Sequence, residues 1–221
     1  FGASPCSDDL GRWIEIWNLV FPQFNQAKDG SRLPLPAPGI DTGMGLERVT
    51  AIMQGVPSAY ETELLGPIVA VAEQLSGRQY GTDEVTDFAL RVMVEHARSA
   101  TFLIADGVVP ANEGRGYVLR RVIRRGVRFA RKLGVHEPFL AKVSEKVIET
   151  MSGKYPELLE HRTFVLRSLD AEEERFDEAI ALGMPLLDGM LVKGGTIAGE
   201  DAFLLYDTYG FPFELTQEIA R

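Results

Sequence analysis

The amino-acid sequence predicts an α+β fold, in which a short β region is followed by a mainly helical domain. Residues 15–26 are rich in aromatic and β-branched side chains, which favour strands. From residue 57 onward, apolar residues recur at three- and four-residue spacing, the period of an amphipathic helix, and few strand patterns remain. We therefore divide the 221-residue chain into residues 1–56 and residues 57–221.

Local patterns predict the elements of the first part in order. A strand over residues 15–26 comes first, and Asp29 and Gly30 form a turn after it. Three prolines between residues 34 and 38 then indicate an extended, exposed connection. A glycine-rich turn leads from there into a helix over residues 46–53.

The second part contains a series of predicted helices, most of which are followed by a glycine. They span residues 62–75, 84–106, 115–133, 139–151 and 200–209, and a long helix begins at Pro156. We expect Gly183 and Pro185 to kink or break the long helix, because a proline inside a helix removes a hydrogen bond and clashes with the preceding turn.

Composition excludes several classes of protein. Charged residues make up 25% and hydrophobic residues 45%, so wholesale disorder is excluded. The single cysteine, Cys6, cannot form an internal disulfide, and three widely spaced histidines without cysteine partners do not form a zinc pattern. No apolar run is long enough to span a membrane, and residues 1–10 do not resemble a signal peptide. We expect a reduced, cytoplasmic protein with no metal site and no membrane partner.

Charge is distributed unevenly along the chain. The net charge is −9, yet residues 115–132 carry eight basic side chains and no acidic one. In the helix expected there, the apolar residues share one face and leave the arginines on the other. This pattern favours a local site for a polyanion, and the absence of acids favours nucleic acid. The alternative is a solvated helix that pairs with an acidic cluster, formed by Asp170, Glu172, Glu173, Glu174, Asp177 and Glu178.

Three short segments contain residues that could carry chemistry. In residues 41–48 (DTGMGLER), the glycines would let the main chain approach a ligand, Asp41 could hold an ammonium group, and Arg48 could reach a phosphate. Residues 112–117 (NEGRGY) place an asparagine before the basic helix, where its amide could bind base edges. Residues 205–212 (LYDTYGFP) end a helix with two tyrosines and an aspartate. On spacing alone, the first segment is more often a plain glycine turn and the last a plain helix end.

Four segments in this order resemble bacterial alanyl-tRNA synthetases: residues 15–21 (EIWNLVF), 41–48, 114–121 (GRGYVLRR) and 205–212. The resemblance implies the C-terminal part of the antiparallel sheet of a class II catalytic domain, with residues 41–48 as its third signature motif. Residues 57–221 would be the helical tRNA-recognition domain. The first two signature motifs and the editing domain with its zinc ligands would lie in missing parts of the same protein, so we expect this fragment alone to be inactive and to hold no zinc.

The resemblance also implies roles for residues of the first part. Asp41 would bind the ammonium group of alanine, Trp17 and Asn18 would line the alanine pocket, and Gly43 would keep that pocket small. Gly45 and Arg48 would bind ATP, which the family uses with Mg²⁺. Arg48 would be the catalytic residue that neutralises phosphate charge.

In the second part the resemblance implies contacts with the acceptor stem of tRNA(Ala). Asn112 and Asp207 would read the stem, in which the family recognises a G·U pair. Arginines of the basic helix would support its phosphate backbone: Arg115, Arg120, Arg121, Arg124 and Arg125.

Two other interpretations stay open at this point. A non-catalytic RNA-binding module needs only the basic helix, and its RNA affinity would not depend on Asp41 or Arg48. A purely structural helical domain would have no RNA affinity and would use its basic face in internal ion pairs.

Overall fold

The computed structural model describes residues 14–192, 194 and 196–220, which form two compact units that meet in sequence at Gly66. The first unit comprises residues 1–66 and the second residues 67–221. Cys6 lies outside the described residues.

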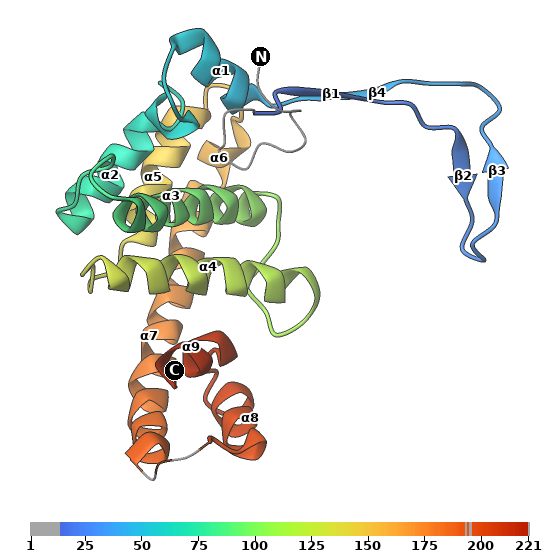
Figure 1. Cartoon of the computed structure of the whole chain (residues 1–221). Coiled ribbons are helices and arrows are strands. Elements are labelled where there is room, and N and C mark those ends of the chain that lie inside the picture. Colours follow the sequence, from blue (N-terminus) through green and yellow to red (C-terminus); the bar gives the residue numbers. More distant parts are fainter. Residues whose placement is uncertain (1–13, 193, 195, 221) are drawn as a thin grey trace. The chain divides into compact units, whose positions relative to one another are not determined.

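The strands of the first unit form one long hairpin, the extended β region of Figure 1. β1 (Trp17–Val20) pairs antiparallel with β4 (Asp41–Met44), and β2 (Phe24–Gln26) pairs antiparallel with β3 (Arg32–Pro34). The predicted single strand is interrupted between β1 and β2, where Pro22 cannot donate a ladder hydrogen bond. The connection rich in proline contains β3, which the sequence did not predict.

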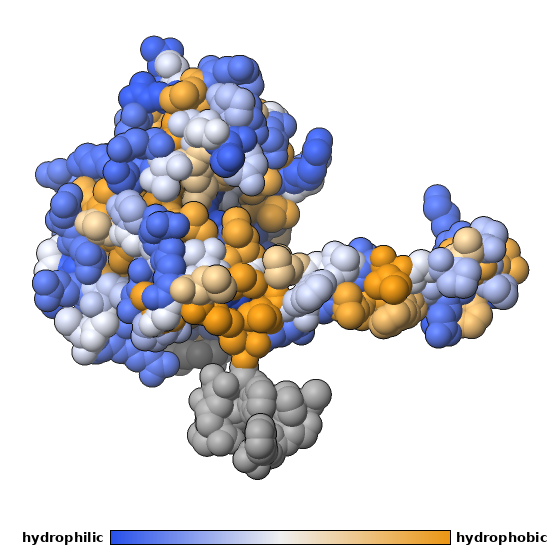
Figure 2. Space-filling model, turned by 90° about the horizontal axis from the view of Figure 1, so that it is seen from above, coloured by the Kyte–Doolittle hydropathy of each residue, from blue (hydrophilic) through white to orange (hydrophobic). Residues whose placement is uncertain are grey.

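The β1–β4 ladder has no core of its own. All eight of its residues are exposed, and the exposed fractions of Trp17 and Leu19 are 59% and 54%. Figure 2 shows hydrophobic side chains exposed along these strands. Two strands with both faces open cannot exclude water, so the ladder needs further strands or another surface to become stable.

Two helical segments follow the hairpin in the first unit. α1 (Leu46–Gln54) begins directly after β4, as predicted, with Gly45 as its N-cap. The short 3₁₀ helix η2 (Ala59–Glu61) comes next, and the Ser58 hydroxyl accepts a hydrogen bond from the Tyr60 backbone N–H at its start. α2 begins only at Gly66, four residues later than the predicted start at residue 62.

The second unit is helical throughout its described elements. They are α2 (Gly66–Ser76), α3 (Glu84–Ala105), α4 (Gly114–Lys132), α5 (Leu140–Met151), α6 (Glu157–Glu160), α7 (Arg162–Val192), α8 (Gly199–Asp207) and α9 (Phe213–Ile219). Figure 1 shows α3 and α4 side by side, with α7 crossing both. The apolar faces of α3, α4 and α5 contribute to a core whose fully buried members include Leu90, Met93, Leu119, Ile123, Leu140 and Ile148.

The long C-terminal helix differs from the prediction. The short helix α6 ends at Glu160, and α7 continues without a break through Gly183 and Pro185 to Val192, so a break at these residues is wrong. The alternative of a kink there stays a prediction. Gly183 serves packing: a Cβ at this position would lie 2.3 Å from Cδ2 of Phe211. α9 was not predicted; it spans only seven residues, directly after Pro212. No helix in the described part of the chain is long and apolar enough to cross a bilayer.

Candidate functional site

The β1–β4 ladder carries the residues expected to bind alanine. In its register, Asn18 lies opposite Gly43 and Val20 lies opposite Asp41. Cross-strand partners share a face, as do alternate residues of one strand, so Asn18, Gly43 and Asp41 lie on the same face. A Cβ added to Gly43 would lie 3.5 Å from Oδ1 of Asn18 and would fill part of the space above that face.

Trp17 lies on the opposite face of the same ladder. Its indole N–H donates to Oγ1 of Thr42, and this hydroxyl donates in turn to the backbone oxygen of Asn18. Thr42 lies between Asp41 and Gly43 in β4. The sequence did not single out Thr42, yet its hydrogen bonds fix the strand segment that presents Asp41 and Gly43.

Arg48 extends from the first turn of α1 back toward β1. Its Nη1 atom donates to the backbone oxygen of Glu15 at 2.6 Å, and the Glu15 carboxylate accepts a hydrogen bond from Nδ2 of Asn18 at 3.1 Å. Gly45 leaves room for this path, since a Cβ there would lie 3.2 Å from Cδ of Arg48. Glu15 therefore contacts both Arg48 and Asn18, through its backbone oxygen and its side chain respectively.

The end of the ladder fits the phosphates of ATP but offers no protein cage for Mg²⁺. Arg48 is exposed beside the backbone of Gly45, where a guanidinium and a main chain without side-chain bulk can meet an anion. Among the described residues, no group of three or more His, Cys, Asp or Glu side chains could hold a metal ion. A magnesium ion that enters with ATP would be bound mainly by phosphate oxygens and water.

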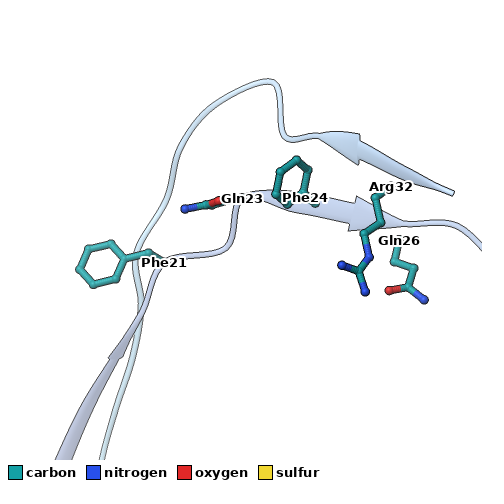
Figure 3. Close-up of a pocket in the computed structure, with 5 residues that line it drawn as sticks. All are labelled: Phe21, Gln23, Phe24, Gln26 and Arg32. Atoms are coloured by element: carbon teal, nitrogen blue, oxygen red, sulfur yellow. The ribbon is translucent and has the colours of Figure 1, made fainter. Parts of the chain in front are cut away.

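A second concave region lies on the β2–β3 hairpin and is shown in Figure 3. It has a volume of about 350 Å³ and is lined by Phe21, Gln23, Phe24, Gln26 and Arg32. None of the predicted site residues lines it. It is an open surface on exposed strands, and no ligand is assigned to it.

A larger groove of about 670 Å³ in the second unit gathers most of the residues expected to bind RNA. Asn112, which precedes α4, and Asp207, at the end of α8, both line it although they lie 95 positions apart. Four of the five predicted arginines line it as well, namely Arg120, Arg121, Arg124 and Arg125, whereas Arg115 does not. The fold thus brings together residues that were linked only by resemblance.

The return of the chain along α7 places α8 beside α4. An apolar cluster of Leu187, Leu205 and Phe211 packs α8 and the segment after it against α7. On the groove side, the hydroxyls of Tyr117 in α4 and Tyr206 in α8 are 2.7 Å apart and share a hydrogen bond. Asp207, the residue after Tyr206, is therefore held at the rim of the groove.

Part of the basic face of α4 is used in ion pairs with α7, as the structural interpretation predicted. Arg120 and Arg124 each donate from Nε to Oε1 of Glu172, at 3.2 Å and 2.8 Å. Arg131 pairs with Asp177 at 2.7 Å and lies 3.8 Å from Glu173. The sequence identified the acidic cluster, but helical periodicity alone could not show which of its members would meet which arginine.

Other cations of α4 face solvent or the groove. Arg115, Arg121 and Arg125 are exposed, and the guanidinium of Arg125 lies over the ring of Phe129 at 5.7 Å. His96 of α3, which the sequence did not single out, lines the groove. Burial, and then the positive charge of Arg125, lower the pKa of His96 to about 4, so this side chain is neutral at pH 7.

Comparisons with known proteins agree on one family. Residues 3–221 match the family described as tRNA synthetases class II (A). An alanine–tRNA ligase of Dehalococcoides mccartyi is 58% identical over 223 residues, which cover 99% of this chain and 26% of that protein. The alanine–tRNA ligases of Pelotomaculum thermopropionicum and Geobacillus thermodenitrificans are 50% and 48% identical and are covered to 25% and 26%. The chain spans about a quarter of the length of these relatives.

Proposed function

Because this chain belongs to the alanine family of class II tRNA synthetases, we propose that it is part of a cytoplasmic alanine–tRNA ligase. The first unit would supply the end of the aminoacylation site, and the second unit would bind the acceptor stem of tRNA(Ala). The observation that carries this proposal is the groove in which Asn112 and Asp207 meet the arginines of α4.

The reaction would proceed in two transfers. A carboxylate oxygen of alanine attacks the α-phosphorus of ATP, the bond to the β-phosphate breaks, and pyrophosphate leaves alanyl-adenylate behind. A ribose hydroxyl of the terminal adenosine of the tRNA then attacks the alanyl carbonyl carbon, loses its proton, and releases AMP. The protein's contribution to both transfers is to position the substrates and to compensate their charge.

The residues on one face of the β1–β4 ladder would bind alanine. The Asp41 carboxylate would accept hydrogen bonds from the ammonium group, and charge assistance makes such a contact strong. The missing side chain of Gly43, next to Asn18, would leave room for a small substrate only. Trp17, on the opposite face of the ladder, would act on this pocket indirectly, through its hydrogen bond to Thr42.

Arg48 would compensate charge on the ATP phosphates. Its guanidinium can leave the Glu15 backbone oxygen for a phosphate, which is a stronger acceptor because it is charged. Gly45 would let the nucleotide approach the main chain. Magnesium ions bound with ATP would neutralise further phosphate charge.

Asn112 and Asp207 would read the acceptor stem with opposite polarity. Arg120 donates from Nη1 to Oδ1 of Asn112, and since an arginine can only donate, this contact identifies the oxygen and leaves the amide nitrogen as the donor that RNA could meet. Asn112 would then donate to a base carbonyl, and Asp207 would accept from a base amino group. A G·U pair presents both kinds of group at its edge. Arg115, Arg121 and Arg125 would contact phosphates without reading the sequence.

The test is a pair of assays on the full-length protein. We expect alanine-dependent exchange of pyrophosphate into ATP, and transfer of alanine to tRNA(Ala). Exchange with glycine or serine in place of alanine should be far slower. RNA binding without any exchange would contradict the enzyme and would leave an RNA-binding module, whose affinity would not depend on Asp41 or Arg48.

We also expect the 221-residue chain by itself not to form alanyl-adenylate. Within residues 14–66, the described part of the first unit, the ladder has two exposed strands that do not enclose the alanine and ATP sites. Exchange by the chain alone at a rate near that of the full-length enzyme would contradict this expectation.

A further inference from the structure

A buried carboxylate, that of Glu172, contacts two of the arginines that line the groove of Asn112 and Asp207. Glu172 of α7 is only 2% exposed to solvent, and its Oε1 atom accepts hydrogen bonds from both Arg120 and Arg124. A carboxylate buried in this way is retained in a folded protein only where charged donors compensate its loss of water. Glu172 therefore fixes the two guanidinium groups in place.

Each of the two arginines reaches one side of the groove. Arg120 donates from Nη1 to Oδ1 of Asn112, so it joins Glu172 to the side chain of Asn112. Arg124 donates from Nη1 to the backbone oxygen of Gly210 at 2.8 Å, three residues after Asp207. A guanidinium is planar and its donors have fixed directions. The position of the Glu172 carboxylate therefore determines where Arg120 holds Asn112 and where Arg124 holds Gly210.

We propose that Glu172 is a positioning residue that sets the separation of Asn112 and Asp207 and thereby the choice of base pair. The inference rests on the proposed function of these two residues. It also changes the expected role of Arg120 and Arg124, which act as the connecting groups between Glu172 and the two sides of the groove.

The neighbouring residue offers a matched control. Glu173 is fully buried in the same helix, but its carboxylate accepts hydrogen bonds from the backbone N–H groups of Phe139 and Leu140 and lies near Arg131. It holds the start of α5, and in the described structure its partners are Phe139, Leu140 and Arg131 rather than Asn112, Asp207 or the arginines that reach them. Replacement of Glu173 thus removes a buried carboxylate without loosening the groove.

The experiment compares Glu172→Gln and Glu173→Gln in the full-length enzyme. Aminoacylation is measured as kcat/KM on two RNA hairpins that differ only in a G·U or G·C pair of the acceptor stem. Each rate is divided by the alanine-dependent pyrophosphate exchange of the same preparation, which corrects for the folded fraction. We expect Glu172→Gln to lower the G·U preference at least tenfold and Glu173→Gln to change it less than twofold.

A second variant keeps the proposal testable if Glu172→Gln does not fold. Arg124→Lys retains the positive charge but cannot span Glu172 and the Gly210 oxygen together, so it should lower the preference similarly. Where Glu172→Gln folds, adding it to a variant that carries both Asn112→Ala and Asp207→Ala should cause less than a twofold further loss, since both side chains that Glu172 positions are then gone.

The outcomes separate the two proposals. If Asn112→Ala and Asp207→Ala leave the preference unchanged, the proposed reading function is wrong. If these variants lower the preference while Glu172→Gln and Arg124→Lys leave it within twofold of the wild type, the positioning role is overturned. Equal losses in Glu172→Gln and Glu173→Gln would also overturn it, because they would reflect a general effect of losing a buried charge.

Discussion

Replacement of Gly183 by alanine should loosen the contact between α7 and Phe211. A Cβ at position 183 would lie 2.3 Å from Cδ2, 2.8 Å from Cγ and 3.1 Å from Cβ of Phe211. The Phe211 side chain is fully buried among Leu187 and Leu205, so it cannot yield by rotating into solvent. The chain must therefore shift around Phe211, and with it the end of α8 that carries Asp207.

A matched substitution in the same helix isolates the size of the effect. Gly189 has no atom within 4 Å of an added Cβ, so Gly189→Ala should gain about 1 kcal/mol from helix propensity alone. Gly183→Ala gains the same amount but also pays about 1–3 kcal/mol for overpacking a filled core. The free energy of unfolding of Gly183→Ala should thus lie about 1–3 kcal/mol below that of Gly189→Ala.

Urea denaturation of the chain, followed by helical circular dichroism, measures this difference, because nearly all described helices lie in the second unit. In the full-length enzyme, Gly183→Ala should also reduce the preference for a G·U stem, and Gly189→Ala should not. Equal stabilisation by the two substitutions would refute the packing argument and would mean that Phe211 moves at little cost.

Three further predictions concern single side chains. Burial raises the pKa of Glu173 from 4.5 to about 7. Its favourable contribution to the free energy of unfolding is therefore complete below pH 4.5 and is lost as the pH rises through 7. In denaturation curves, Glu173→Gln should remove a pH dependence on the order of 3 kcal/mol. In the full-length enzyme, Asp41→Asn should weaken alanine binding by about 2–5 kcal/mol in pyrophosphate exchange and leave the KM for ATP nearly unchanged; an unchanged KM for alanine would make Asp41 a turn residue. Arg121→Ala or Arg125→Ala should weaken binding of G·U and G·C stems alike and reduce the salt dependence, as measured by titration at several salt concentrations.

The helical domain could be predicted well from the sequence because its signals are local. Apolar spacing and following glycines gave the bounds of α3 and α4 to within one residue at each end. The break predicted as one effect of Gly183 and Pro185 is absent, because Leu187 packs α7 against Leu205 and Phe211 despite the loss of one helical hydrogen bond. The rule that a proline breaks a helix describes an isolated helix better than one that is held along its length.

The sequence suggested individual candidate residues for the site, but it could not show how these residues lie relative to one another. The resemblance identified Asn112 and Asp207, and the charge pattern identified a basic helix with an acidic cluster. Only the structure brings Glu172 beneath Arg120 and Arg124, because that pairing depends on how α4 and α7 cross. His96 carries no sequence signal either, since its place in the groove follows from the packing of α3 on α4.

The most direct test of the central claim is the stem preference of Asn112→Ala and Asp207→Ala in the full-length enzyme. Aminoacylation of the G·U and G·C hairpins is measured for each variant and for the wild type. Both variants should lose about 1–3 kcal/mol of discrimination, because each removes one contact to a base edge. If both variants slow the two stems equally and the preference stays at the wild-type value, these residues do not read the pair, and the groove of the second unit is not the site where the RNA is chosen.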